Sequence, residues 1–222
     1  MKFPNAHNGV KKIYFAELLS LIATIVMVVS AFVMLIGMAV IETTGTASTG
    51  MEVVTVIALI LVLSSFAALL VAFVFNLIGI IKASADEDQF RSALIFTIIG
   101  MVVSMIPGFF PNSPIVASAM SAVTPVVQML ITIFVVQGII NLALKLGNNE
   151  LAQKGNKVLT MTLLAFLLSS IANLLATIFQ ANETMEIAAA AIAIIGMILS
   201  IVAYFIYLGY LKKAVKMLEA AE

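Results

Sequence analysis

The sequence predicts an all-α integral membrane protein with six transmembrane helices, and three observations lead to that prediction. Hydrophobic residues make up 63% of the 222 residues and charged residues only 10%, whereas about a quarter of a soluble domain is charged. Six apolar stretches are each long enough to cross a hydrocarbon layer of roughly 30 Å, which takes about 20 helical residues. Every lysine lies in a terminal segment or in an alternate connection between these stretches, and Arg91 lies at the start of the third stretch. The six expected spans are 13–41, 53–81, 90–107, 115–144, 158–180 and 186–211.

The first span follows three lysines, which is also typical of a signal peptide. Its apolar run, 13–41, exceeds the roughly 7–15 residues of a signal h-region, so we expect it to be retained. Acidic residues at 86–88 precede the third span and place negative charge at a helix N-terminus. Pro107, Pro111 and Pro114 predict a break between the third and fourth spans, and Gly147 predicts a helix C-cap after the fourth. Asn182 is expected to cap the sixth.

Charge predicts the orientation in the bilayer. The basic residues lie before the first span, between the second and third, between the fourth and fifth, and after the sixth. Under the positive-inside rule, both termini are then cytoplasmic, and we expect a multi-pass protein of a bacterial cytoplasmic membrane. Three tyrosines near the same interface, Tyr14, Tyr207 and Tyr210, are expected to be interfacial anchors.

An internal repeat predicts that the chain is one transmembrane domain, 1–222, built from three helical hairpins of the same orientation. The segment 16–23, AELLSLIA, returns at 165–172 as AFLLSSIA, with six of eight positions identical. The hairpins are expected at about 13–82, 90–145 and 158–212. The second helix of each ends on a similar pattern, which begins at Gly79, Gly138 and Gly209.

Small residues recur at steps of three and four along four of the spans, and each set falls on one helix face. Close approach through small residues is a main source of helix association in lipid, so these faces are expected to pack against other helices. Packing inside the bundle and an interface with a second copy or a partner membrane protein both remain open. The residues are Ala16, Ser20 and Ala23; Ala93, Thr97 and Gly100; Ala165, Ser169 and Ala172; and Ala189, Ala193, Gly196, Ser200 and Ala203.

Two spans carry more polar residues than packing requires. The fourth has Ser121, Thr124, Gln128 and Thr132 on one face, and the fifth has Asn173. A buried amide in hydrocarbon needs a partner, so Gln128 and Asn173 are expected to point inward. Hydrogen bonds between helices explain these residues, and a ligand or ion pocket is the alternative.

Residues for catalysis or metal binding are sparse. The sequence has no cysteine, and His7, its one histidine, is expected to be solvated. Glu17 lies about one turn beyond Lys12, which favours interfacial solvation or ion pairing, with proton or cation coupling as the alternative. No catalytic motif, metal site or cofactor site is predicted. The net charge is zero, which disfavours nucleic-acid binding and leaves the lipid bilayer as the expected partner.

Two function classes follow. We expect a non-enzymatic structural, assembly or accessory membrane component, because no charged or aromatic binding signature is present in the spans. The alternative is a small-molecule or ion transporter, or its binding subunit, with a pocket near Gln128 and Asn173. In size, helix count and the small-residue pair Ala16 and Ser20, the chain resembles the membrane-embedded substrate-binding subunits of energy-coupling-factor vitamin transporters. That resemblance implies a binding subunit.

Overall fold

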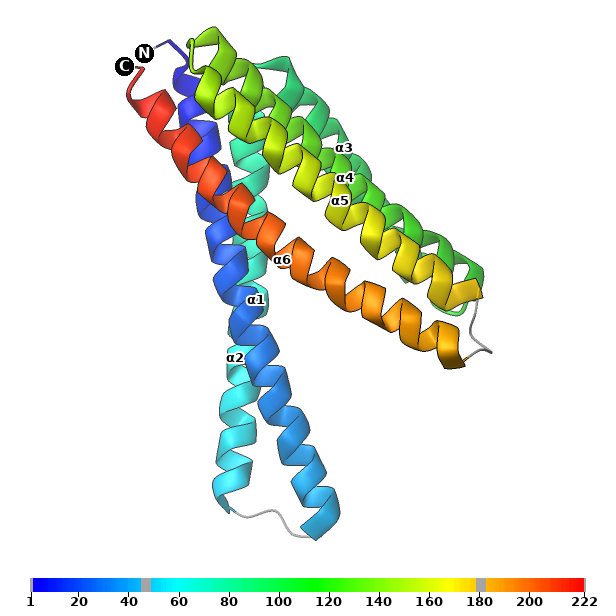
Figure 1. The fold of residues 1–222 in the computed structure, drawn as a ribbon. Coiled ribbons are helices and arrows are strands. Elements are labelled where there is room, and N and C mark those ends of the chain that lie inside the picture. Colours follow the sequence, from blue (N-terminus) through cyan, green and yellow to red (C-terminus); the bar gives the residue numbers. More distant parts are fainter. Residues whose placement is uncertain (1, 45–48, 179–182, 222) are drawn as a thin grey trace. The chain divides into compact units, whose positions relative to one another are not determined.

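The described residues form six long helices. The computed structural model describes residues 2–44, 49–178 and 183–221 (Figure 1). Within these ranges it describes every side chain except those of residues 41–52, 114, 117 and 173–189. The helices are α1 (Pro4–Thr44), α2 (Thr49–Ala83), α3 (Asp88–Phe109), α4 (Pro114–Lys145), α5 (Asn149–Ile178) and α6 (Glu183–Glu219).

All six helices are long and apolar enough to cross a membrane, so the structure has six candidate spans at the six predicted places. The predicted hairpin pairing is also confirmed: α1 packs against α2, α3 against α4 and α5 against α6. Each of α1, α2 and α6 continues beyond its apolar run. In α6 the extension from Lys212 to Glu219 consists mainly of strong helix formers, and it buries Ala214 and Leu218 in the main unit.

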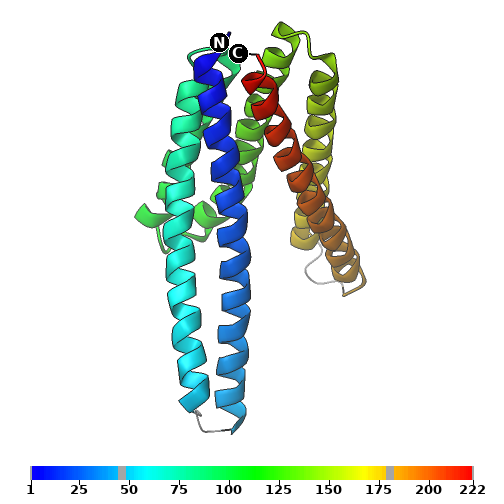
Figure 2. The same cartoon turned by 90° about the vertical axis from the view of Figure 1, so that its left-hand side faces the viewer.

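The chain forms two compact units. The hairpin unit comprises residues 12–78, and the main unit comprises residues 1–11 and 79–222. In the hairpin unit, α1 and α2 run antiparallel (Figure 2). Ala16, Ala23 and Ser30 are buried there, and Gly37 approaches Thr55 so closely that a Cβ on the glycine would lie 3.3 Å from the threonine Oγ1.

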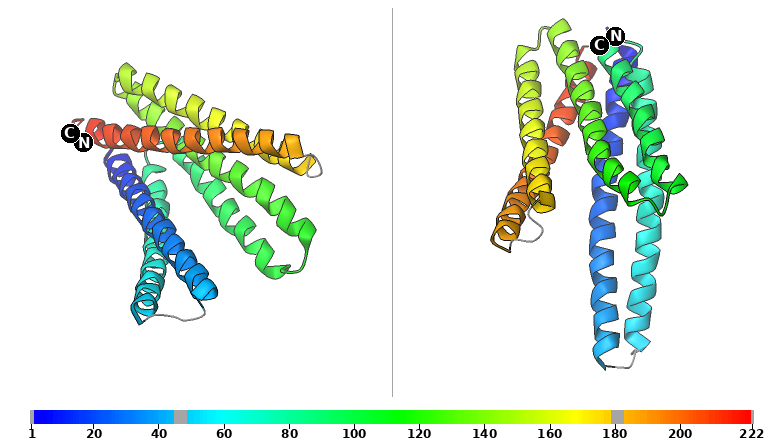
Figure 3. Two further views of the ribbon diagram at one scale, coloured as in Figure 1. Left: turned by 60° about the horizontal axis from the view of Figure 1, so that its bottom comes forward. Right: turned by 90° about the vertical axis from the view of Figure 1, so that its right-hand side faces the viewer.

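In the main unit, the helices α3, α4, α5 and α6 pack in chain order, each beside the next (Figure 3). The segments that carry its basic residues all lie at one end. These segments are residues 2–11, the α2–α3 turn, the α4–α5 turn and the end of α6 (Figure 1).

Close backbone contacts fix this end of the main unit. A Cβ on Gly9 would lie 2.5 Å from the carbonyl oxygen of Gly79, so the first turns of α1 touch the end of α2 directly. A Cβ on Gly138 would lie 2.7 Å from the ring of Phe90, which is fully buried. Both glycines therefore allow a helix contact that any larger residue would prevent.

The turn between α4 and α5 is fixed by hydrogen bonds. Gly147 has φ +74°, a conformation that glycine adopts without strain. The N–H of Asn148 donates to the carbonyl of Ala143 at 2.8 Å, and the N–H of Gly147 donates to that of Leu144 at 3.0 Å. This pair of bonds is a Schellman motif and confirms the predicted C-cap. Asn148 Oδ1 then accepts from the N–H of Leu151 at 3.0 Å and caps α5.

Proline produces the predicted break between α3 and α4. Pro107 lies in the last turn of α3, and Pro114 is the first residue of α4, where its missing N–H costs nothing. Ser113 caps α4 by accepting from the N–H of Val116 at 3.4 Å. The predicted cap at Asn182 lies outside the described residues.

Candidate functional site

The polar residues predicted to line a pocket in the bundle lie mostly on the outside of α4. Ser121, Thr124 and Gln128 are exposed and Thr132 is half-buried, while Val127 beside them is 7% exposed. The inward orientation expected for Gln128 is therefore not seen. The side chain of Asn173 lies outside the described residues.

Hydroxyl groups along the spans bond mainly to their own helices. Thr132 Oγ1 donates to the carbonyl of Gln128 at 3.1 Å, and Ser121 Oγ donates to that of Ser118 at 2.7 Å. Thr97 Oγ1 donates to the carbonyl of Ala93 at 2.9 Å, and Ser200 Oγ donates to that of Gly196 at 2.8 Å. Such bonds satisfy a hydroxyl in hydrocarbon without a partner helix or ligand. The side-chain amide of Gln128 makes no hydrogen bond within the described part of the chain.

The small-residue faces differ in how far they are covered. Gly196 meets Ser169 on α5, where a Cβ on the glycine would lie 3.2 Å from the serine Oγ. Gly100 meets Val127 on α4 at the same distance, measured to Val127 Cγ1. Buried residues are Ala16, Ala23, Ala93, Thr97, Ala165, Ala172, Gly196 and Ala203; Ser20, Gly100 and Ser169 are half-buried; Ala193 and Ser200 are exposed; and the side chain of Ala189 lies outside the described residues.

Two carboxylates of the α2–α3 turn bind to helices other than the one that follows them. Asp86 accepts from the backbone N–H of Ala6 at 2.7 Å and from Asn5 Nδ2 at 3.0 Å, so it caps the first turn of α1. Glu87 accepts from Asn141 Nδ2 at 2.9 Å and from Lys145 Nζ at 2.6 Å, both on α4. The negative charge predicted for the start of α3 thus serves mainly to join α1 and α4 to this turn.

Glu87 is buried, with 6% of its surface exposed. Burial alone raises the pKa of its carboxyl, but hydrogen bonds from Asn141 and Lys145, together with the lysine charge, outweigh burial. The net effect places the pKa of Glu87 below its ordinary value. Lys145 is 51% exposed, so this ion pair lies at the edge of the unit and is partly solvated.

Glu17, in the hairpin unit, is half-buried and accepts a hydrogen bond from Asn76 Nδ2 at 3.2 Å. Lys12 stands 5.1 Å from the centre of the Phe75 ring, in cation–π geometry. Phe15 meets the same ring edge to face at 5.6 Å between centroids. Polar and aromatic side chains therefore hold this end of α1 against α2.

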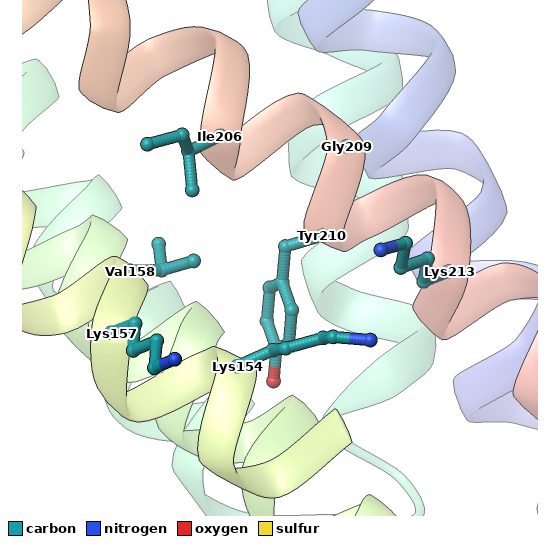
Figure 4. A pocket seen from close by; sticks show the side chains of 7 residues that line it. All are labelled: Lys154, Lys157, Val158, Ile206, Gly209, Tyr210 and Lys213. Carbon is teal, nitrogen blue, oxygen red and sulfur yellow. The ribbon is translucent and has the colours of Figure 1, made fainter. Parts of the chain in front are cut away.

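A cavity of about 310 Å³ opens between α5 and α6 near the basic end of the main unit (Figure 4). Its apolar wall contains Val158 and Ile206, which face each other across the cavity, and the ring of Tyr210. Three lysines stand at its rim: Lys154 and Lys157 on α5, and Lys213 on α6. Gly209 completes the lining, and a Cβ built there would have no heavy atom of the described residues within 4 Å.

Tyr210 is 3% exposed, and its hydroxyl has no hydrogen-bond partner in the described structure. The ring packs against α5 where Gly155 leaves room, since a Cβ on that glycine would lie 2.5 Å from Tyr210 Oη. Tyr207 is 6% exposed. The expectation that these two tyrosines are interfacial anchors is therefore wrong, because both rings are buried within the main unit.

His7 was expected to be solvated, but it is buried, with only 8% of its surface exposed. It follows Pro4, where α1 already begins, and shares a helix face with the buried residues Ala6 and Val10. The early helix start was not visible in hydropathy, because this segment is polar. Within 2–44, 49–178 and 183–221, no group of three histidine or acidic residues is placed to hold a metal ion.

The cavity was not predicted because its lining comes from two helices, and Lys213 lies more than 50 residues after Lys154 and Lys157. In the sequence these lysines indicate only the orientation in the membrane. The one signal that pointed to the place was Gly209, which was predicted to be equivalent to Gly79 and Gly138.

Comparison with other proteins adds no family to these observations. No known protein family, curated protein or solved structure matches this chain.

Proposed function

We propose that this chain is a non-enzymatic structural, assembly or accessory component of a bacterial cytoplasmic membrane, built from three hairpins with both termini in the cytoplasm. The observation that supports it is that hydroxyl groups in the spans donate hydrogen bonds to backbone carbonyls of their own helix. These hydroxyls belong to Ser121, Thr132, Thr97 and Ser200. A transport or catalytic site needs polar groups that converge on one place. These groups point back along separate helices.

Exposed small residues support an assembly role. Ala193 and Ser200 are seven residues apart on α6 and exposed, so they lie on one open face of that helix. Small residues allow another helix backbone to approach closely in lipid. A second copy of this chain or another membrane protein would fit such a face.

Transport of a small molecule or ion, or binding for a transporter, is the second candidate. It rests on Gln128, whose exposed amide has no hydrogen bond in the described structure. An amide in hydrocarbon favours a polar partner, which a substrate can supply.

A thermal-shift screen in detergent separates the two candidates. The intact chain is heated with water-soluble ions, vitamins, amino acids and nucleosides, beside the variants Gln128→Leu and Asn173→Leu and the control Gln137→Leu. A ligand at 100 times its Kd adds about 2.7 kcal/mol of stability. We expect no saturable shift and variants within about 0.5 kcal/mol of the parent chain. A saturable shift that both variants lose and the control keeps would replace our proposal with the transport function.

A further inference from the structure

We propose that the cavity between α5 and α6 binds the phosphate group of an anionic phospholipid. This proposal concerns a different part of the molecule from Gln128 and does not depend on the function proposed above. It rests on the charge at the cavity rim, the apolar wall, and the open space at Gly209.

The rim carries an excess of positive charge. Lys154 is paired with Glu150, one turn earlier on α5. Lys213 is attracted to the same Glu150 carboxylate, and Lys157 forms no ion pair within the described part of the chain. Three lysines that line one cavity therefore share a single carboxylate (Figure 4). Two lysines beside one cavity repel each other, and an anion between them removes that repulsion. The rim therefore favours a negatively charged group.

The wall selects against an ion without an apolar part. Away from the lysine ammonium groups, the cavity is lined by Val158, Ile206 and the Tyr210 ring, which offer mostly carbon atoms. A phospholipid places its phosphate at the height of the lysine ammonium groups and its glycerol and acyl carbons against such a wall. Basic pockets between transmembrane helices hold lipid headgroups by this combination.

The third hairpin is open where the other two are closed. At Gly138 the Phe90 ring lies so close that no Cβ would fit, and the backbone of Gly79 lies directly against Gly9 of α1. At Gly209, predicted to be equivalent to them, a Cβ would have no heavy atom within 4 Å. This opening is what leaves room for a ligand between α5 and α6. It also allows a larger side chain to fill the cavity without displacing either helix.

The test measures lipid binding by native mass spectrometry of the full chain in detergent, titrated with dioleoyl phosphatidylglycerol or with zwitterionic dioleoyl phosphatidylcholine. We expect phosphatidylglycerol to bind more tightly. Lys157→Gln with Lys213→Gln should weaken its binding about 30-fold, from the usual contribution of a lysine near an anionic lipid. Gly209→Leu keeps all the lysines and should weaken binding by filling the cavity.

Two controls are matched to these variants. Lys212→Gln with Lys216→Gln removes two exposed charges from the same end of α6 that do not line the cavity. Gly108→Leu enlarges another helical glycine that has open space around it. Both controls should bind phosphatidylglycerol within about threefold of the parent chain, which is the scatter expected for surface changes.

Three outcomes would overturn the proposal. Equal loss of binding in the two lysine pairs would show general surface attraction. Unchanged binding in Gly209→Leu would place the lipid elsewhere. Competition by inorganic phosphate at the affinity of the lipid would show that the rim binds a free anion and that the apolar wall contributes nothing. If the lysine variant fails to fold, Gly209→Leu against Gly108→Leu decides the question alone.

Discussion

Glu87 is a residue whose charge state matters to the main unit. It is buried, and its carboxylate joins the α2–α3 turn to Asn141 and Lys145 of α4. A hydrogen bond to a charged group contributes roughly 1.5–3 kcal/mol. Loss of this charge should therefore weaken the packing of the α2–α3 turn against α4.

Acid should therefore destabilise the chain through Glu87. Its folded pKa lies below the ordinary value of 4.5, so its contribution is complete above that pH and is lost as the pH falls through the folded pKa. We expect the unfolding temperature in detergent to fall as the pH drops below about 4.5, and Glu87→Gln to reduce that dependence while costing roughly 1–3 kcal/mol at pH 7.

The control for acid sensitivity is Asp88→Asn, which removes an exposed carboxylate next in the chain. It should keep the pH dependence of the parent chain. The same pH dependence in Glu87→Gln as in the parent would assign the effect to other carboxylates.

The contacts and burial of individual residues were harder to predict than the helices. Hydropathy and charge placed Glu87 correctly in a turn, but its partners Asn141 and Lys145 are more than 50 residues away, and spacing along one helix does not reveal them. For the same reason Gln128 was expected to be buried and is exposed, since a polar face predicts which residues lie together and not what covers them.

At the scale of helices, glycine determines how closely α4, α5 and α6 approach. Gly155 lies on α5 between Lys154 and Lys157, and both Ile140 of α4 and Tyr210 of α6 pack against it. Gly209, one residue before Tyr210, faces open space. Two glycines near the same cavity thus have opposite surroundings.

Alanine at these two positions should have opposite effects. Gly155→Ala places a Cβ 2.5 Å from Tyr210 Oη and should cost roughly 1–3 kcal/mol through overpacking. Gly209→Ala meets nothing and should stabilise the chain by up to about 1 kcal/mol, the difference in helix propensity. Thermal unfolding of both variants in one detergent gives the comparison, and equal effects would contradict the packing described for α5.

Helix number, order and pairing were predictable because each depends on local composition. Apolar length gave six spans, and prolines 107 and 114 with Gly147 gave two of the turns. Helix ends beyond the apolar runs were not predictable in this way. The start of α1 at Pro4 and the continuation of α6 to Glu219 depend on packing at the end of the main unit, which hydropathy does not record.

For the molecule as a whole, the main prediction is its orientation in the bilayer. In the main unit the basic segments share one end, as alternating charge predicts for a multi-pass protein. Reporter domains fused after Met51 and after Glu183 should lie outside the cytoplasm, and one after Gly147 inside. Protease protection or reporter activity measures each, and a reversed result at any of the three sites would overturn the orientation.

The division into two units was not predicted. The sequence indicated one domain of three similar hairpins, and that repeat stays a prediction. The first eleven residues belong with α3–α6 because Gly9 packs on Gly79 and Asp86 caps the start of α1, whereas the rest of α1 pairs with α2. Neither contact leaves a trace in hydropathy.

The bond from Asp86 to the first turn of α1 also sets an order of events during synthesis. The N–H of Ala6 leaves the ribosome long before the carboxylate that it binds. The first turn of α1 therefore lacks this cap while the rest of α1 and α2 are made. It can reach its final bonding only when the turn at 84–87 has emerged, so Ala6 settles later than the helix residues that follow it.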